Sequence, residues 1–362
     1  MKLALDATYS MDPRPSGVAV YSRRLIAELM RIGGRHRLSL FYRPHRFLAA
    51  LPRSNHRGAC KLPLSDRLLG LMSRFFSVFH GLNQRLPRCR LPASVATFHD
   101  LFVLTAEYST PEFRRRFAAF AQDAAGRADV IIAVSDHTRR QVVSLLGRPG
   151  NQVTVVPHGV DPPRAASPEQ IDRLRRRLDL RGRFLLHVGA LQERKNILRL
   201  LTAFEQGPKD LDLVLAGSSG FGAAAILERI ARSPARERIR HLGYVDDFTR
   251  AALLRSATAL AFPSLDEGFG LPVLEAMAAG LPVLTSNRSA LPEVAGDAAV
   301  LVDPFDVDAI REGLTSLTED EALQGRLREA GLRRAAQFTW ERTALSVLKI
   351  YESVASGPRS RL

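Results

Sequence analysis

The sequence predicts an α/β protein of two domains, each built on a parallel β-sheet. The chain has 362 residues, of which 46% are hydrophobic, and this is enough for two cores of ordinary size. Short apolar runs alternate with helical patterns along most of its length, which is typical of parallel strands joined by helices. A proline-rich segment at residues 161–168 lacks this periodicity and indicates a linker between two series of elements.

The first series is expected to begin with a strand at residues 3–7, a loop as far as Gly17 and a helix through Tyr21, Leu25 and Leu29. Further strands are expected at residues 38–41, 95–98, 130–134 and 153–156, with helices at 113–125 and 136–146. The second series has strands at residues 184–188, 211–216, 239–242, 259–262 and 282–285, again with helices between them. Trp340 begins a last helix at residues 339–354 and is expected to anchor it at a domain junction.

Each series has the alternating strands and helices of a Rossmann-like domain. We therefore expect an N-terminal domain at residues 1–165 and a C-terminal domain at residues 166–340. The helix within residues 341–362 is expected to pack back on the N-terminal domain.

The basic residues are concentrated in the first half of the chain. Lys and Arg number 52 against 37 Asp and Glu, and residues 1–164 hold 25 of the former and 11 of the latter, a net charge of +14. This asymmetry predicts contact with something anionic, for which lipid headgroups, a lipid-linked phosphate and nucleic acid are candidates. An arginine-rich solvated surface is the alternative. Nucleic acid is not expected, because no binding motif or aromatic stacking stripe accompanies the charge.

Two segments of the basic half, at residues 67–79 and 113–117, combine apolar residues with cations. They predict peripheral contact with the inner leaflet of a membrane, ordinary core helices being the alternative. No apolar run reaches the roughly 18 to 20 residues of a membrane span, and Asp6 interrupts the apolar start that a secretory signal needs, so a cytoplasmic protein is expected. Cys60 and Cys89 have no spacing that suggests a metal site or a disulfide framework.

Two cations follow the first strand of the second series. In parallel sheets ligands bind beyond the carboxyl ends of the strands, and the loop at residues 189–196 contains Arg194 and Lys195 just before a helix that is expected to begin at Ile197 with Asn196 as its N-cap. The helix dipole makes cations unfavourable there by a few tenths to about 1 kcal/mol unless an anion joins them. The pattern favours a phosphate site over two solvated loop cations.

A glycine-rich turn at residues 265–275 follows a later strand and opens a helix whose first residue is expected to be Pro272. Gly268 and Gly270 allow close approach of the backbone, so that amide N–H groups can face a phosphate. Glu267 and Glu275 flank the turn. Because a carboxylate in the first helical turn also complements the helix dipole, Glu275 alone is weak evidence for a ligand-binding site.

The two glutamates with seven residues between them, the flanking Pro263-Ser264 and the sequence at residues 276–280 resemble the signature of family 4 glycosyltransferases of the GT-B fold. The likeness is dense in the second half and thinner in the first, where it rests on Gly17, His99-Asp100, Ser135 and residues 156–161. The resemblance implies two Rossmann-like domains facing each other across a cleft, with the acceptor bound by the N-terminal domain and a nucleotide sugar by the C-terminal domain.

The resemblance also implies roles for individual residues. Arg194 and Lys195 would grip the donor diphosphate, Glu267 would contact the sugar, and Glu275 would hold the ribose hydroxyls. Other donor-binding positions implied in this way are Gly17, Tyr244, Val245, Phe269, Gly270 and Leu271.

His99 would touch the transferred sugar or the acceptor, and Asp100 either orients the His99 ring or caps the segment that follows. Two departures from the family pattern are Ser16 where a second glycine is common and His158 where asparagine is common.

The expected activity is retaining, with no protein nucleophile, because cations and amides can stabilise the charge that builds on the departing diphosphate. No metal and no other cofactor is expected, since no Asp-x-Asp motif follows a predicted strand and the adjacent Asp246 and Asp247 begin a helix. The pattern is most similar to mannosyltransferases of surface polysaccharide assembly, so GDP-mannose and a lipid-linked or glycan acceptor are expected. A UDP-sugar-dependent transferase and a nucleotide-sugar epimerase of the same fold remain alternatives, whereas a nicotinamide enzyme would need a G-x-G-x-x-G motif that residues 12–17 lack.

Overall fold

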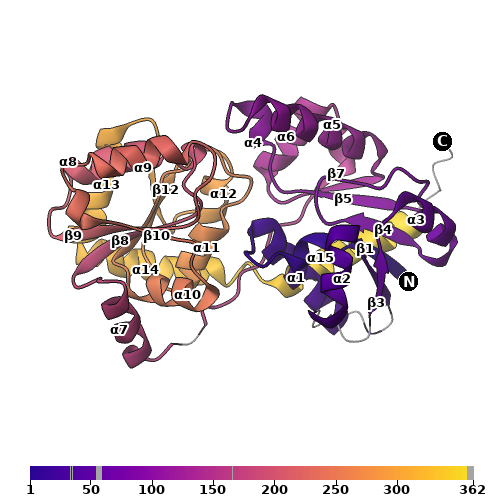
Figure 1. The fold of residues 1–362 in the computed structure, drawn as a ribbon, viewed down its shortest axis with the longest axis horizontal. Coiled ribbons are helices and arrows are strands. Elements are labelled where there is room, and N and C mark those ends of the chain that lie inside the picture. Colours follow the sequence, from indigo (N-terminus) through magenta and orange to yellow (C-terminus); the bar gives the residue numbers. More distant parts are fainter. Residues whose placement is uncertain (33, 35, 54–58, 165, 357–362) are drawn as a thin grey trace. The chain divides into compact units, whose positions relative to one another are not determined.

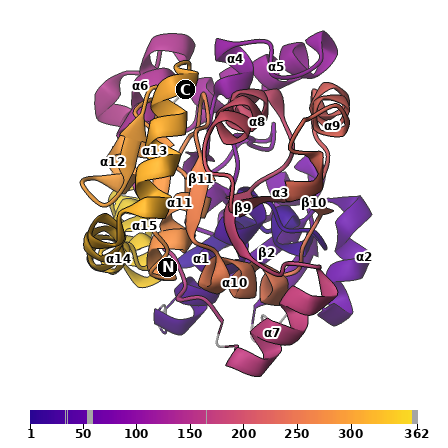
Figure 2. The same cartoon turned by 90° about the vertical axis from the view of Figure 1, so that its left-hand side faces the viewer.

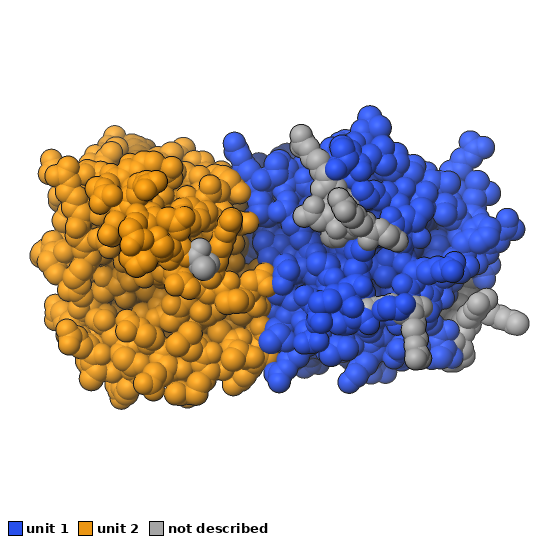
Figure 3. Space-filling model, turned by 90° about the horizontal axis from the view of Figure 1, so that it is seen from below, with its two compact units in different colours: residues 1–159, 339–362 blue, residues 160–338 orange. Residues whose placement is uncertain are grey.

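The computed structural model describes residues 1–32, 34, 36–53, 59–164 and 166–356 (Figure 1). The chain divides into two compact units, unit 1 at Met1–Gly159 with Thr339–Leu362 and unit 2 at Val160–Phe338, coloured blue and orange in Figure 3. Each unit has a parallel sheet of its own.

Unit 1 contains, among its described residues, seven parallel strands in the order β3-β2-β1-β4-β5-β6-β7. The side chains of Leu3 and Leu5 in β1 and Val95 in β5 share one core with the buried face of the first long helix, where Tyr21 and Leu25 point inward. The strands are β1 (Lys2–Asp6), β2 (Arg37–Tyr42), β3 (Cys60–Pro63), β4 (Val78–Gly81), β5 (Ser94–Phe98), β6 (Val130–Ala133) and β7 (Val153–Val155). The longer helices are α1 (Gly17–Ile32), α2 (Pro44–Arg53), α3 (Asp66–Met72), α5 (Pro111–Arg127) and α6 (Asp136–Leu146), with short turns η1 (Thr8–Met11), η2 (Ser73–Phe75), α4 (Phe102–Thr105) and η3 (Gly150–Gln152).

The last helix, α15 (Trp340–Ser356), packs against α1 of unit 1 (Figure 1). Trp340 is 3% exposed, and a Cβ added to Gly159 would lie 2.2 Å from its backbone nitrogen. The Thr343 hydroxyl donates to the carbonyl of Pro157 at 2.8 Å. The unit boundary therefore falls after Gly159 and not after residue 165, because the residues before it are held by α15.

Unit 2 contains, in its described part, six parallel strands in the order β10-β9-β8-β11-β12-β13, and Figure 2 shows helices on both sides of them. The strands are β8 (Arg183–Val188), β9 (Leu211–Ala216), β10 (Ile239–Gly243), β11 (Ala259–Phe262), β12 (Val283–Ser286) and β13 (Val300–Val302). The helices are α7 (Pro168–Arg177), α8 (Ile197–Gln206), α9 (Ala223–Ala231), α10 (Asp247–Ser256), α11 (Leu271–Ala278), α12 (Leu291–Ala295), α13 (Val307–Glu319) and α14 (Glu321–Ala335), with turns η4 (Glu193–Lys195) and η5 (Arg236–Arg238).

The two predicted parallel sheets are confirmed, but the sequence did not predict β3, β4 or β13. The segment at residues 67–79 is not one amphipathic stretch, because it divides into α3, η2 and β4. Val78 and Phe79 are buried in the sheet, whereas Leu71 is 69% and Phe75 50% exposed.

Candidate functional site

The loops at the carboxyl edge of the unit 2 sheet approach each other closely. A Cβ added to Gly217, directly after β9, would lie 1.9 Å from the carbonyl oxygen of Gly189, directly after β8. The Gly217 N–H also donates to the Gly243 carbonyl at the end of β10 at 2.8 Å. Glycine at position 217 therefore lets the backbone of one of these loops lie against another.

Arg194 and Lys195 both contact one carboxylate, that of Glu267 after β11. Oε1 of Glu267 accepts from Nζ of Lys195 at 2.5 Å and lies 2.8 Å from Nη1 of Arg194, and the three side chains are only 9–10% exposed. Burial alone would raise the pKa of Glu267, but the charges of the two cations outweigh it and lower this pKa to about 2. The cluster carries a net charge of +1 at the edge of the sheet, which suits it to an anion.

The Glu267 carboxylate is fixed beside the two cations. Both Arg194 and Lys195 contact its Oε1. The backbone of Glu267 is also anchored, because its N–H donates to the Ser289 hydroxyl at 3.1 Å. The arrangement holds a buried carboxylate beside two cations at the edge of the sheet.

Asn196 occupies the N-cap position of α8 and joins three loops through its side chain. Its backbone is left-handed, with φ of 60°, and its side chain makes no capping bond to the helix. Nδ2 donates instead to the carbonyls of Pro263 at 3.0 Å and Pro304 at 2.6 Å, which follow β11 and β13. Asn196 therefore occupies the predicted N-cap position without a side-chain capping bond, because its amide holds the neighbouring loops beside Arg194 and Lys195.

The glycine-rich turn opens α11 at Leu271, one residue before the predicted Pro272. Gly270 has φ of 113°, and an added Cβ would lie 2.8 Å from Cδ2 of Leu291, so both backbone conformation and space require glycine. Phe269 is buried edge-to-face against Phe338, at 6.0 Å between ring centroids. The first N–H groups of an α-helix have no carbonyl of the same helix to bind, so this turn presents donors at the edge of the sheet.

Glu275 lies in the second turn of α11, not in the first, so it is not placed to complement the helix dipole as predicted. Its carboxylate pairs with Nη2 of Arg250 at 3.4 Å, and burial raises its pKa. Tyr244 and Val245 directly follow β10, and the Tyr244 side chain is 41% exposed.

Comparisons with known proteins agree with this arrangement. The family model described as Glycosyl transferases group 1 matches residues 169–334, and the one described as Glycosyltransferase Family 4 matches residues 15–164. The chain is 31% identical over 284 residues to the O-antigen chain mannosyltransferase B of Escherichia coli, an alignment that covers 76% of this chain and 74% of the relative. It is 30% identical over 391 residues to a phosphatidyl-myo-inositol mannosyltransferase of Mycobacterium tuberculosis, with 98% and 97% covered.

The chain belongs to the family 4 glycosyltransferases. The solved structure of Anabaena HepE in complex with UDP and glucose has a TM-score of 0.78 to this chain at 19% identity, and the match covers 97% of this chain and 99% of HepE. The glycosyltransferase WaaG of lipopolysaccharide biosynthesis has a TM-score of 0.73 at 17% identity, with 99% and 100% covered. These likenesses establish the GT-B fold.

Gly17 and His99 belong to unit 1 of this glycosyltransferase. Gly17 is the first residue of α1, and His99 follows β5. Nε2 of His99 lies 2.9 Å from the Leu82 carbonyl, which can only accept, so the proton is on Nε2 and Nδ1 is an acceptor with no hydrogen-bond partner among the described residues. The ring stacks on His158 at 5.3 Å, and burial lowers its pKa to about 4, so His99 is neutral at physiological pH.

Asp100 directly follows His99 and lies before α4, in which Leu101 holds the N-cap position without a side-chain capping bond. Nε2 of His99 donates to a main-chain carbonyl, that of Leu82, and this contact orients the ring.

Sequence analysis missed His187, which lies in β8 of the glycosyltransferase and is 0% exposed. Nδ1 donates to the Ala261 carbonyl at 3.0 Å, and Nε2 has no partner among the described residues. A Cβ on Gly189 would lie 3.4 Å from both Nε2 of His187 and Cε of Lys195, so the ring lies near Lys195. The only signal was a histidine within an otherwise apolar strand, which is more often structural.

The described residues of the glycosyltransferase contain no group of three or more His, Cys, Asp or Glu side chains placed to hold a metal ion. Asp246 and Asp247 begin α10, where Asp246 caps the helix by accepting from the Thr249 N–H at 2.7 Å.

Proposed function

We propose that this glycosyltransferase moves mannose from GDP-mannose, with retention of anomeric configuration, to a lipid-linked or glycan acceptor in surface polysaccharide biosynthesis. The observation that carries the proposal is the pair of buried cations, Arg194 and Lys195, which share the single carboxylate of Glu267 beside a glycine-rich helix start. The choice of mannose is supported by the two relatives, which are named as mannosyltransferases.

Transfer in this site depends on stabilising the leaving group. As the bond between the sugar and the diphosphate breaks, negative charge grows on the diphosphate oxygens. Arg194 and Lys195, together with the N–H groups of Gly270 and Leu271 at the start of α11, would stabilise that charge. Because these donors are fixed by the loops around them, they need little rearrangement when the charge develops.

Glu267 has a second part in the proposal. Its Oε1 orders the two cations, and Oε2 would accept a hydrogen bond from a hydroxyl of the transferred sugar. Glu275 would hold the ribose hydroxyls, while Gly17, Tyr244, Val245 and Phe269 would complete the donor site. The neutral Nδ1 of His99 would accept from a hydroxyl of the sugar or the acceptor. No protein nucleophile, metal ion or other cofactor takes part in the proposed reaction.

We further propose that unit 1 contacts the inner leaflet of a membrane from the cytoplasm. Leu71, Phe75 and Phe113 are 69%, 50% and 47% exposed, in the half of the chain with a net charge of +14. No helix in the described part of the chain is long and apolar enough to span a bilayer. Sedimentation with vesicles of anionic lipid at low salt tests the contact. Equal recovery with neutral and anionic vesicles would contradict it.

Turnover with a panel of donors tests the proposed reaction. Purified enzyme is supplied with GDP-mannose, UDP-glucose or ADP-glucose and a lipid-linked acceptor, and the released nucleotide and the anomeric configuration of the product are measured. The proposal predicts GDP release and an α-linked mannoside, with no change when divalent ions are chelated. Release of UDP alone would assign the donor to the UDP sugars, and an interconverted nucleotide sugar without transfer would identify an epimerase.

A further inference from the structure

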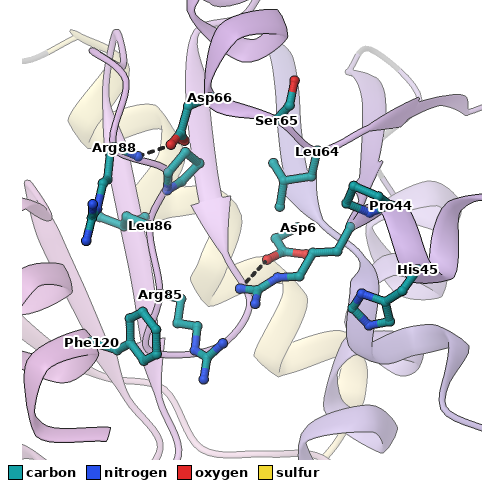
Figure 4. A pocket seen from close by; sticks show the side chains of 12 residues that line it. Asp6, Pro44, His45, Leu64, Ser65, Asp66, Arg85, Leu86, Arg88 and Phe120 are labelled. Carbon is teal, nitrogen blue, oxygen red and sulfur yellow. Dashed lines mark hydrogen bonds and ion pairs between the residues drawn. The ribbon is translucent and has the colours of Figure 1, made fainter. Parts of the chain in front are cut away.

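A second polar pocket lies wholly within unit 1, far in sequence from the cations of unit 2. It has a volume of about 550 Å³ and opens at the carboxyl ends of β1 to β4, the edge at which parallel sheets bind ligands (Figure 4). The charged and aromatic side chains that line it are Asp6, Arg43, His45, Asp66, Arg85, Arg88 and Phe120.

Both carboxylates of the pocket already have partners. Asp6 accepts from the N–H and the hydroxyl of Thr8 at 3.1 and 2.5 Å, and Arg43 lies 3.8 Å away. Asp66 accepts from the backbone N–H of Arg88 at 2.9 Å, the second dashed contact in Figure 4. The lining therefore has three arginines against two carboxylates that are engaged with the protein itself.

Arg85 has no such partner. Its guanidinium lies over the Phe120 ring, 4.1 Å from the centroid, and no described carboxylate pairs with it. Burial lowers the pKa of Arg85, and the charges of Arg43 and Arg116 act in the same direction, against Tyr9 and Asp6. An anion in the pocket would supply a negative countercharge for the Arg85 guanidinium. The planar guanidinium can bind two oxygens of a carboxylate or a phosphate.

The loop that contains Arg85 is fixed by hydrogen bonds from α5 and by close packing on the end of β4. Arg127 of α5 donates to the carbonyls of Leu86, at 3.0 Å, and Pro87. A Cβ on Gly81, the last residue of β4, would lie 2.2 Å from the Arg85 carbonyl, so the loop folds tightly back on the strand. A guanidinium on so well fixed a loop loses little freedom when it binds a ligand.

We propose that this pocket binds an oxyanion of the acceptor, a phosphate or a carboxylate attached to its sugar, with Arg85 as the direct ligand. Arg88 and Arg43, which also line the pocket, add positive potential. The inference rests on the proposed transferase function and adds to it that the acceptor is acidic where it enters unit 1.

Calorimetric titration of the full-length enzyme tests the pocket. The probes are glucose 1-phosphate, glucuronate and the neutral methyl glucoside, each measured with and without excess GDP, because a sugar phosphate can also enter the proposed donor site. The pocket predicts that at least one anionic probe binds in the presence of GDP and more tightly than the neutral one. Which of the two anionic probes binds decides between phosphate and carboxylate.

Three variants assign the binding to Arg85. Arg85→Gln removes the charge and is expected to weaken the anionic probe about 10- to 100-fold, the value of one charged hydrogen bond, while Arg85→Lys retains part of the affinity. Arg90→Gln removes a charge from an exposed arginine outside the pocket and is the matched control, expected to change binding less than about 2-fold.

Equal affinity for charged and neutral probes, or unchanged binding in Arg85→Gln, would overturn the inference. The thermal shift produced by GDP is measured on the same samples. A normal shift in Arg85→Gln shows that the variant is folded, so that weaker binding of the probe belongs to the pocket. Absence of a nucleotide shift in wild type would count against the proposed function and not against the pocket.

Discussion

Replacing Glu267 by glutamine should destabilise unit 2 and at the same time make it respond more strongly to a nucleoside diphosphate. The change leaves Arg194 and Lys195, each 9% exposed, without their shared countercharge. The pKa of Glu267 falls from the usual 4.5 to about 2. That difference corresponds to about 3 kcal/mol in favour of the charged form, and it agrees with the roughly 3 to 5 kcal/mol typical of breaking a buried ion pair. For a unit of this size the loss corresponds to a fall of about 6 to 20 °C in melting temperature.

The response to nucleotide should change in the opposite direction. In the wild-type protein a diphosphate meets a cluster whose net charge is +1, whereas in Glu267→Gln it meets a cluster whose net charge is +2. GDP should therefore raise the melting temperature of Glu267→Gln by more than it raises that of wild type. GDP is used without a sugar because the variant would also lose the proposed contact of Oε2 with the transferred hexose.

Glu205→Gln is the matched control. Glu205 lies in the same unit, is 10% exposed, and accepts from Arg229 at 2.6 Å and from Ser233. Its removal should destabilise unit 2 without increasing the effect of GDP. If Glu205→Gln and Glu267→Gln respond equally to GDP, or if the shift in Glu267→Gln is no larger than in wild type, the assignment of the cation cluster to a diphosphate is refuted.

Two further predictions concern the fold. Burial lowers the pKa of His99 and His187 to about 4 each. As the pH falls below 6.5, these histidines are protonated in the unfolded chain before they are protonated in the folded protein. The free energy of unfolding is therefore highest above pH 6.5 and decreases towards pH 4. At pH 5 each histidine should cost about 2 kcal/mol, seen as a lower melting temperature than at pH 7.5, and equal melting temperatures at the two values would contradict this. Gly159→Ala should destabilise unit 1 by about 3 kcal/mol or more in urea, because the new methyl group meets the backbone of Trp340, while GDP binding persists. Gly126→Ala, with open space at its Cβ, is the control, and an equal effect of the two changes would show that α15 adapts.

Most strands that the sequence predicted are rich in apolar, buried residues. β9 was predicted with its observed bounds because all but one residue of Leu211–Ala216 are apolar and buried. β3 was missed because it contains Lys61 and Pro63 at the edge of the sheet, where half-exposed residues suffice. β13 was missed because it has only three residues. β4 was missed because it follows the apolar segments α3 and η2, so its own apolar residues do not mark a separate strand.

The loops of the site were predictable, but the contacts between them were not. Glycines and charges mark the segments around Arg194 and Glu267 in the sequence, yet their pairing depends on β8 lying beside β11. The same holds for Asn196, which resembles a cap locally but bonds to carbonyls 67 and 108 residues away. The pocket around Arg85 combines the end of β1, the segments that follow β2, β3 and β4, and one residue of α5, so no local sequence pattern predicts it.

The most direct test of the account is the stabilisation of wild type and Lys195→Ala by GDP, UDP and ADP in a thermal-shift assay. A nucleotide at 100 times its Kd stabilises a protein by about 2.7 kcal/mol, or roughly 5 to 11 °C for a unit of this size. The account predicts such a shift in wild type from one nucleoside diphosphate, GDP, and its near absence in Lys195→Ala. A shift of equal size in the variant, or no shift in wild type with any of the three, would contradict the claim that the cations of unit 2 bind the donor diphosphate.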